Sequence, residues 1–259
     1  MRIALGVEYN GAHFCGWQSQ PNQGGVQDAL ELAIQKVAIQ PIRVHAAGRT
    51  DTGVHALMQV VHFETTASRP TTAWVRGVNA HLPETVRVLW ACEVNDAFHA
   101  RFSAQQRSYQ YVLFNQPQHA AIQHDRVGWY HQSLDIALMQ QAIAYLLGEH
   151  DFSAFRASEC QAKSPVRCMT VAKVRQVGHY FIFEFSANAF LQHQVRNMVG
   201  ALIYVGAGKQ DANVIQTLLT ARDRTQSPPT FSPNGLYLSG VQYGAEWGLP
   251  DTQRQLTLI

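Results

Sequence analysis

The chain has 259 residues, of which 46% are hydrophobic and 15% charged, and its formal net charge at pH 7 is +2. These proportions are typical of a globular protein with a sizeable core, and the length allows one large domain or two smaller ones. No stretch approaches the roughly 18 consecutive apolar residues of a transmembrane helix, so we expect no membrane association. The four cysteines form no Cys-x-x-Cys pair, which signals neither a zinc site nor a disulfide framework.

The N-terminus indicates where the protein is located, and the basic residues indicate what it binds. Glu8 follows the first residues too soon for a signal peptide, so we expect an opening strand and a cytoplasmic protein. Arginine dominates the basic residues, with 16 Arg against 4 Lys. Planar guanidinium groups suit phosphates and stack on bases, which favours a nucleic-acid surface. A general amino-acid bias of the source genome would explain the same excess of arginine, and composition alone does not distinguish this explanation from a nucleic-acid surface.

The first half of the chain alternates between strand and helix patterns. Residues 26–37 place apolar side chains on one helical face at the 3.6-residue period: Val26, Leu30, Ala33, Ile34 and Val37. Residues 71–81 follow Pro70 and are predicted to form a short helix. Strands are predicted over residues 2–9, 57–64 and 86–93.

The second half repeats this pattern. Strands are predicted over residues 107–115, 169–177, 180–187 and 236–243, with Gly178-His179 as the hairpin turn between the middle two. Helices are predicted for a stripe that starts at Ile136 and stops at Gly148, and over residues 193–205 and 211–221. The phenylalanines at 181, 183 and 185 share one face of a strand and are expected in the core. Residues 150–156 are predicted to be a loop, and 226–234 an irregular, ordered connection.

Together these elements predict an α+β architecture of two pseudo-duplicated domains, each a mainly antiparallel sheet flanked by helices. We place the boundary so that residues 1–101 form the first domain and residues 102–259 the second. The cleft between them is the expected active site.

The string Ala47 to Ala56 carries the candidate nucleophile, Asp51. Gly48 and Gly53 allow the backbone to take positive φ and to approach a ligand closely, and Arg49 favours an ionised carboxylate nearby. The alternative is an aspartate that hydrogen-bonds its own backbone in a turn. The ten residues alone do not decide between these interpretations.

Two further segments combine aromatic and basic side chains. Tyr109 and Tyr111 lie two apart in a strand and share a face, so one is expected in the core and the other at the end of the cleft. Arg196 lies in a helix with an apolar stripe, where an arginine needs a carboxylate partner, and we expect Asp51 to be that partner. A solvent-facing position at the flank of the helix is the alternative.

Twelve histidines raise the question of a metal, but no His-x-x-x-His or His-x-Glu string places two ligands on one helical face. We therefore expect no metal site.

Six strings resemble the tRNA pseudouridine synthase A family, in the family's order and across nearly the whole chain. The Gly-Arg-Thr-Asp-x-Gly-Val-His-Ala core is the most specific of them. The strings are Tyr9 to Gln18, Ala47 to Ala56, Phe98 to Tyr111, Gly148 to Arg167, Phe190 to Gly200 and Gly235 to Leu238. Departures lie at Ser227 to Asn234, only loosely similar to the family pattern, and at Asn10, where Asp is common.

The resemblance implies the pseudouridine synthase fold and the conversion of uridine to its C-linked isomer at positions 38, 39 and 40 of the tRNA anticodon stem-loop. It implies no cofactor, and a homodimer on which one tRNA spans both subunits. Asp51 is similar to the family's nucleophile, which attacks either the ribose C1′ or the uracil C6. Both alternatives stay open.

The resemblance also assigns the other site residues. Arg49 would occupy the space left by the flipped base, and Arg196 would pair with the aspartate. Tyr109 would stack on the uracil and assist removal of the C5 proton, and Leu236 would close the other face of the pocket. His55, within the motif, is expected among the substrate-binding residues.

Two other functions compete with this interpretation. Asp51-Thr52-Gly53 matches the Asp-Thr-Gly of aspartic proteases, but those enzymes need two such aspartates that share a proton, and this chain has one. A non-catalytic RNA-binding module would explain the arginines and tyrosines but would give Asp51 no role.

Overall fold

The structure is a computed structural model that describes residues 1–21 and 24–256. The chain forms two compact units. Residues 1–106 and the C-terminal segment from Tyr237 make up the first, and Arg107–Leu236 the second. The domain boundary at residue 101 stays a prediction, and the last strand belongs with the first unit because it pairs with a strand there.

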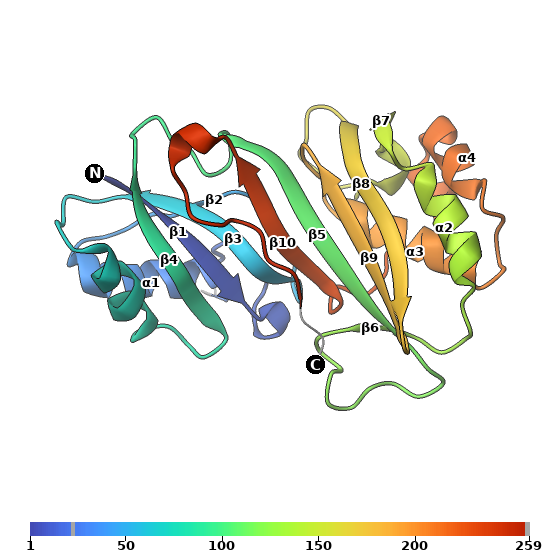
Figure 1. Ribbon diagram of the computed structural model, residues 1–259, viewed down its shortest axis with the longest axis horizontal. Helices are drawn as coiled ribbons and strands as arrows, with labels where there is room; N and C mark the ends of the chain where they lie inside the picture. Colours follow the sequence, from blue (N-terminus) through green and yellow to red (C-terminus); the bar gives the residue numbers. More distant parts are fainter. Residues whose placement is uncertain (22–23, 257–259) are drawn as a thin grey trace. The chain divides into compact units, whose positions relative to one another are not determined.

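The first unit contains a mainly antiparallel sheet (Figure 1). In its centre, β1 (Arg2–Tyr9) lies antiparallel to both β3 (His55–Glu64) and β4 (Val86–Val94). The short β2 (His45–Ala46) also pairs with β3, and β10 (Leu236–Tyr243) joins β3 in parallel. Nine of the ten residues of β3 are buried, so this strand is central to the core.

Helices of the first unit pack as the apolar pattern predicts. The stripe of α1 (Val26–Ala38) is buried at Val26, Leu30, Ala33 and Ile34. The expected helix over 71–81 is present, but its centre, η2 (Ala73–Gly77), is a π-helix. Trp74 of this wide turn is fully buried, and its ring packs edge-on against Phe63 of β3 at 5.3 Å.

The second unit pairs an antiparallel sheet with three helices (Figure 1). Its strands lie in the order β5 (Ala104–Asn115), β9 (Tyr180–Ala187), β8 (Val166–Val177) and β7 (Gly148–Asp151), and β6 (Gly128–Tyr130) runs parallel to β5. The helices α2 (Ile136–Ala144), α3 (Gln194–Gly206) and α4 (Val214–Ala221) contact one another, and α2 packs on β8. Phe181, Phe183 and Phe185 are buried, as expected.

Local structure departs from expectation at a few points. Residues 150 and 151, which were expected in a loop, belong to β7, because the backbone of residues 148–151 pairs with β8. The helix expected from 193 begins at Gln194, since His193 takes a left-handed conformation with φ of 62°. Short turns complete the described chain, at Gly11–His13, Ser153–Phe155, Arg224–Gln226 and Ala245–Trp247.

In the described residues no helix is long and apolar enough to cross a membrane. All four cysteines are thiols.

Candidate active site

Asp51 lies in the turn that links β2 to β3. Its side chain is half-buried, between a buried Thr50 and an exposed Thr52. The Val54 N–H donates to the Asp51 carbonyl at 3.1 Å, which closes the turn. Gly53 has φ of 80°, a conformation that glycine adopts without strain. Of the two glycines that allow positive φ, Gly53 adopts it and Gly48 does not.

The segment that follows β1 packs directly against the Asp51 turn. An added Cβ at Gly11 would lie 1.9 Å from the Val54 carbonyl oxygen, and one at Gly16 would lie 2.8 Å from that of Thr50. Both distances are shorter than any real Cβ contact, so only glycine fits at these positions. The main chains of the two segments therefore approach as closely as their atoms allow.

Hydrogen bonds fix the same turn from two sides. The Tyr9 hydroxyl and Thr50 Oγ1 lie 2.8 Å apart, and the Trp17 N–H donates to the Thr50 carbonyl at 2.9 Å. From β3, Gln59 Nε2 donates to the Gly48 carbonyl at 2.7 Å. Burial raises the pKa of Tyr9 to about 12, so its hydroxyl keeps its proton over the physiological range. The turn that carries Asp51 is thus held by partners on both flanks.

Arg49 and His55 have contrasting surroundings in this unit. Arg49 is exposed to solvent. His55 is 2% exposed, and its Nδ1 accepts a hydrogen bond from the Gly11 N–H at 3.1 Å. Its ring stacks on Tyr237 of β10 with centroids 4.7 Å apart. These contacts tie His55 to the protein, and its substrate role stays a prediction.

Tyr109 and Tyr111 of β5 divide as their spacing suggests. Tyr111 is fully buried, and its hydroxyl donates to the Ser232 carbonyl at 2.9 Å. Tyr109 is half-buried and meets the ring of Phe190 edge-on at 5.1 Å. Tyr111 is therefore the core tyrosine, and Tyr109 keeps part of its ring accessible.

Arg196 lies in the first turn of α3 and is half-buried. Its Nε donates to the Phe231 carbonyl at 2.8 Å, and the Phe231 N–H donates to the Arg196 carbonyl at 3.3 Å. An added Cβ on Gly200 would lie 2.6 Å from the Pro229 carbonyl oxygen. The irregular connection expected over 226–234 is therefore ordered and packed tightly on α3.

A buried amide anchors this connection further. Asn197 is fully buried, and its Oδ1 accepts from Thr230 Oγ1 at 2.7 Å and from Arg224 Nη2 at 3.2 Å. Its Nδ2 donates to the Phe155 carbonyl at 2.7 Å. Because each of these polar groups is satisfied, the network stabilises the connection that holds Arg196.

Leu236 begins β10 and is 5% exposed. The carbonyl of the preceding Gly235 accepts a hydrogen bond from the Val112 N–H at 2.8 Å, and an added Cβ on Gly235 would lie 2.3 Å from the Val112 carbonyl oxygen. This close approach fixes where the strand starts and so where Leu236 lies.

The predicted site residues thus fall into two groups. The structure places Arg49, Asp51 and His55 in the first unit, and Tyr109, Arg196 and Leu236 in the second. A pairing of Asp51 with Arg196 stays a prediction. Sequence reasoning missed the supporting roles of Tyr9, Gln59 and Asn197. For Tyr9, the glycines at 11 and 16 were the sequence feature that could have indicated its role.

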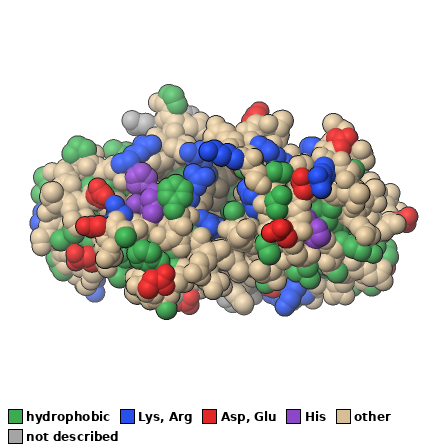
Figure 2. All heavy atoms as spheres, turned by 90° about the horizontal axis from the view of Figure 1, so that it is seen from above, with side chains coloured by type: hydrophobic (Ala, Val, Ile, Leu, Met, Phe, Trp, Pro, Cys, Tyr) green, Lys and Arg blue, Asp and Glu red, His purple; other side chains and the backbone are tan. Residues whose placement is uncertain are grey.

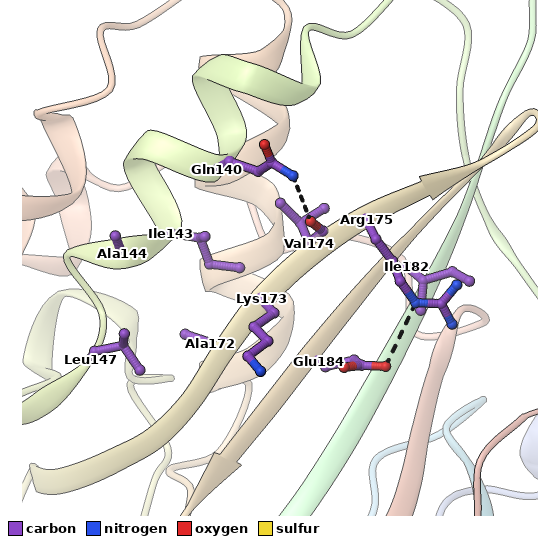
Figure 3. A pocket seen from close by; sticks show the side chains of 10 residues that line it. All are labelled: Gln140, Ile143, Ala144, Leu147, Ala172, Lys173, Val174, Arg175, Ile182 and Glu184. Carbon is purple, nitrogen blue, oxygen red and sulfur yellow. Dashed lines mark hydrogen bonds and ion pairs between the residues drawn. The ribbon is translucent and has the colours of Figure 1, made fainter.

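The second unit also contains a groove, which is drawn in Figure 3. It has a volume of about 350 Å³ between α2 and the hairpin of β8 and β9, and no predicted site residue lines it. Its wall carries a hydrogen bond from Gln140 to the Val174 carbonyl and an ion pair of Arg175 with Glu184. Among residues 1–21 and 24–256, no three His, Cys, Asp or Glu side chains are grouped so as to hold a metal ion.

Comparison with known proteins gives a consistent result. A family model described as tRNA pseudouridine synthase matches residues 6–103 and 142–244. The protein named tRNA pseudouridine synthase A in Methylobacillus flagellatus is 64% identical over 258 residues, covering 100% of this chain and 99% of the relative. Proteins of the same name are 57% identical in Dechloromonas aromatica, covering 97% of this chain and 96% of the relative, and 58% identical in Chromobacterium violaceum, covering 96% of each.

These matches confirm the family and the fold that the sequence motifs predict. The family model extends over both units, and the relatives align with the whole length of the chain. The chain belongs to the tRNA pseudouridine synthase family.

Proposed function

We propose that this protein isomerises uridine to pseudouridine in tRNA, at positions 38, 39 and 40 of the anticodon stem-loop. One observation carries the proposal: the half-buried Asp51 carboxylate stands on a turn fixed by two glycine contacts, in a chain 64% identical to a tRNA pseudouridine synthase A. The comparisons support neither the aspartic-protease interpretation nor the non-catalytic RNA-binding module.

The reaction breaks the N-glycosidic bond, turns the uracil and rejoins it to the ribose through C5. Asp51 would hold the reacting fragment by a covalent bond. If it attacks C1′, the electron pair of the glycosidic bond goes to N1, and C5 later displaces the carboxylate from C1′. If it attacks C6, the C5=C6 electron pair becomes an enolate, the bond between C1′ and N1 breaks with its pair on N1, and C5 bonds to C1′. The carboxylate then leaves C6 as the C5 proton is lost, which restores the C5=C6 double bond. In both cases the C5 proton leaves and N1 gains one, so no electrons enter or leave.

The remaining residues receive roles that suit their surroundings. Arg49 is exposed and would fill the space of the flipped base. The half-buried ring of Tyr109, steadied by Phe190, would stack on the uracil, which is worth about 1 to 3 kcal/mol per base. Leu236 would cover the other face of the base. His55 would shape the substrate-binding region through its contacts with Gly11 and Tyr237.

Arg196 would pair with the Asp51 carboxylate. Its Nε donates to the Phe231 carbonyl, and this bond sets the plane of the guanidinium. The proposed active site would then use residues of both groups.

The net charge of the chain bears on how it would bind tRNA. A net charge of +2 gives a single chain little attraction for a polyanion. We propose a cytoplasmic homodimer in which one tRNA contacts both subunits, since two copies double the basic surface.

Release of tritium from unmodified tRNA with 5-tritiated uridine tests the activity, because the C5 proton must leave. The expected result is catalytic release, with new pseudouridines mapped by carbodiimide-blocked primer extension to positions 38, 39 and 40. Release without modification at these positions would refute the site assignment, and no release would refute the activity.

A further inference from the structure

The turn that follows β4 carries an exposed phenylalanine for which the proposed active site has no use. Phe102 is 76% exposed and belongs to the first unit. Its neighbour Phe98 in the same turn is fully buried. Since an isolated exposed aromatic is common, its surroundings decide whether it has a role.

Hydrogen bonds hold the backbone of this turn at every amide from 99 to 103. His99 Nδ1 accepts from the Arg101 and Phe102 N–H groups at 3.1 and 3.4 Å, and His62 Nδ1 accepts from Ala100 at 3.1 Å. Ser103 Oγ accepts from His99, and the Ser103 N–H donates to the His99 carbonyl. These hydrogen bonds fix the backbone on which Phe102 is presented.

The side chains around Phe102 form an aromatic and basic cluster, which we call the Phe102 platform: His45, His62, His99, Arg101 and Phe102. The ring of His99 lies 4.3 Å from that of Phe102, centroid to centroid, and His62 and His45 follow at 4.6 and 5.5 Å from His99. Arg101 places its guanidinium carbon 5.7 Å from the Phe102 centroid. Figure 2 shows histidine side chains gathered beside basic and hydrophobic ones on one face.

The charges around the platform favour a polyanion. Burial lowers the pKa of His99, and His45, Arg2 and Arg101 lower it further, so its charged neighbours are basic. Of the nearby acids, Glu64 is paired with Arg2, and Asp96 is exposed at the start of the same turn. An aromatic ring beside arginine is the combination that single-stranded nucleic acids use, through stacking and phosphate contact.

The platform is separate from the Asp51 turn within the same unit. His55 and His62 are seven residues apart in β3, so at about 3.3 Å per residue they are about 23 Å apart. Asp51 precedes the His55 end, whereas the platform lies at the His62 end. At about 3.4 Å per nucleotide along a helical strand, that separation corresponds to about seven steps.

We propose that the Phe102 platform is a second RNA contact, on which an unpaired nucleobase of the substrate RNA stacks while another nucleotide occupies the Asp51 site. The base would lie on the exposed ring of Phe102, with Arg101 toward its phosphate. The inference rests on the proposed function, because it takes RNA as the ligand.

The test compares the affinity of full-length unmodified tRNA for the wild type, Phe102→Leu and Phe102→Trp, by fluorescence anisotropy at one fixed salt concentration. Leucine keeps an apolar side chain but removes stacking, and we expect affinity to fall about tenfold or more. Tryptophan keeps the stacking surface and should bind within about threefold of the wild type. Leu32→Ala, on an exposed residue of α1 in the same unit, is the matched control and should leave affinity unchanged.

A second signal reports stacking directly. The fluorescence of Phe102→Trp, after subtraction of the wild-type signal, should be quenched when tRNA binds. In the tritium-release assay the effect of Phe102→Leu should fall on KM rather than on kcat, because the platform does not touch the reacting uridine.

The outcomes separate this inference from the proposed function. A wild type that binds no tRNA would refute the proposed function itself. Wild-type binding with undiminished affinity in Phe102→Leu, or absence of quenching in Phe102→Trp, would overturn the platform alone. A change of oligomeric state in Phe102→Leu, measured by sedimentation, would show that the ring contacts a second copy and would also overturn it.

Discussion

Two loops that carry site residues are held in place by different means. The Asp51 turn is fixed largely by close main-chain approach, at Gly11 and Gly16, where a side chain has no room. The connection over residues 227–234, which holds Arg196, is fixed by a buried side-chain network centred on Asn197. The first loop therefore depends on shape and the second on satisfied polar groups. Substitutions in the two loops should therefore destabilise the protein for different reasons.

The largest effect should come from Gly11→Ala. Its Cβ would lie 1.9 Å from the Val54 carbonyl oxygen, so the Asp51 turn or the segment after β1 must move. We expect a loss of about 3 kcal/mol or more in the free energy of unfolding, together with loss of activity. Chemical denaturation measures the first, and tritium release the second.

Gly48→Ala is the matched control in the same turn. Its Cβ meets no atom within 4 Å, so the free energy of unfolding should change little. Equal stability of the two variants would show that close main-chain approach does not hold this loop.

The next effect concerns the second loop. In Asn197→Leu the size is kept, but the Phe155 carbonyl loses its donor, and Arg224 and Thr230 each lose one hydrogen bond while they remain bonded to each other. A buried group left without a partner costs about 1 to 3 kcal/mol and each further lost hydrogen bond about 1 kcal/mol, so we expect a total loss of about 3 kcal/mol. Hydrogen exchange of residues 227–234 should rise more than that of the Asp51 turn.

Thr220→Val gives the control for this network, because the Thr220 hydroxyl bonds only to its own helix and is exposed. Its free energy of unfolding should stay within about 0.5 kcal/mol of the wild type. A protein that tolerates Asn197→Leu equally well would rule out the buried network as the support of Arg196.

Low pH should reduce the free energy of unfolding of the first unit, because His62 takes up a proton more readily in the unfolded chain. Burial, with the nearby His99 and His45, lowers the pKa of this histidine to about 3. The unfolded chain, with a pKa near 6.5, therefore binds more protons between pH 6.5 and 3, and stability falls as the pH falls through that window. From pH 7.5 to 5.5 the loss should be about 1.4 kcal/mol.

In His62→Asn the side-chain oxygen can still accept from the Ala100 N–H, but nothing titrates at this position. The difference in free energy of unfolding between pH 7.5 and 5.5 should shrink by about the same 1.4 kcal/mol. An unchanged pH dependence would exclude His62 as its source.

The smallest effect should come from Tyr9→Phe, which removes the hydroxyl bonded to Thr50. The loss of one buried hydrogen bond is worth about 1 kcal/mol. If main-chain shape dominates this loop, kcat should fall by only a few fold. A loss of activity as complete as that of Gly11→Ala would show that the hydroxyl, rather than the glycine contact, positions Asp51.

The sequence predicts local features better than distant contacts. The strand over 236–243, the buried phenylalanines of β9 and the turn at Gly53 follow from side-chain periodicity and backbone preference. The π-helix at Ala73–Gly77 does not, because Trp74 reaches its place only through packing on Phe63. The contact of Gly11 with Val54 joins residues more than forty positions apart, and no local pattern encodes it.

In the candidate site, too, the sequence predicts local features better than contacts between distant residues. The motif identified Asp51. Gly11 and Gly16 allow a close main-chain approach, but only the structure shows that the Asp51 turn is what packs against them. The tertiary roles of Asn197 and of His99 did not follow, because a buried amide and an imidazole acceptor are recognised only when their backbone partners are known.

The central claim is that the Asp51 carboxylate attacks the substrate, and Asp51→Asn tests it most directly because the amide keeps the size but loses the nucleophile. The measurement is single-turnover release of tritium from 5-tritiated tRNA, with tRNA affinity measured on the same preparations. The account predicts that the variant binds tRNA about as tightly as the wild type and releases no label. Release at a rate near that of the wild type would contradict it.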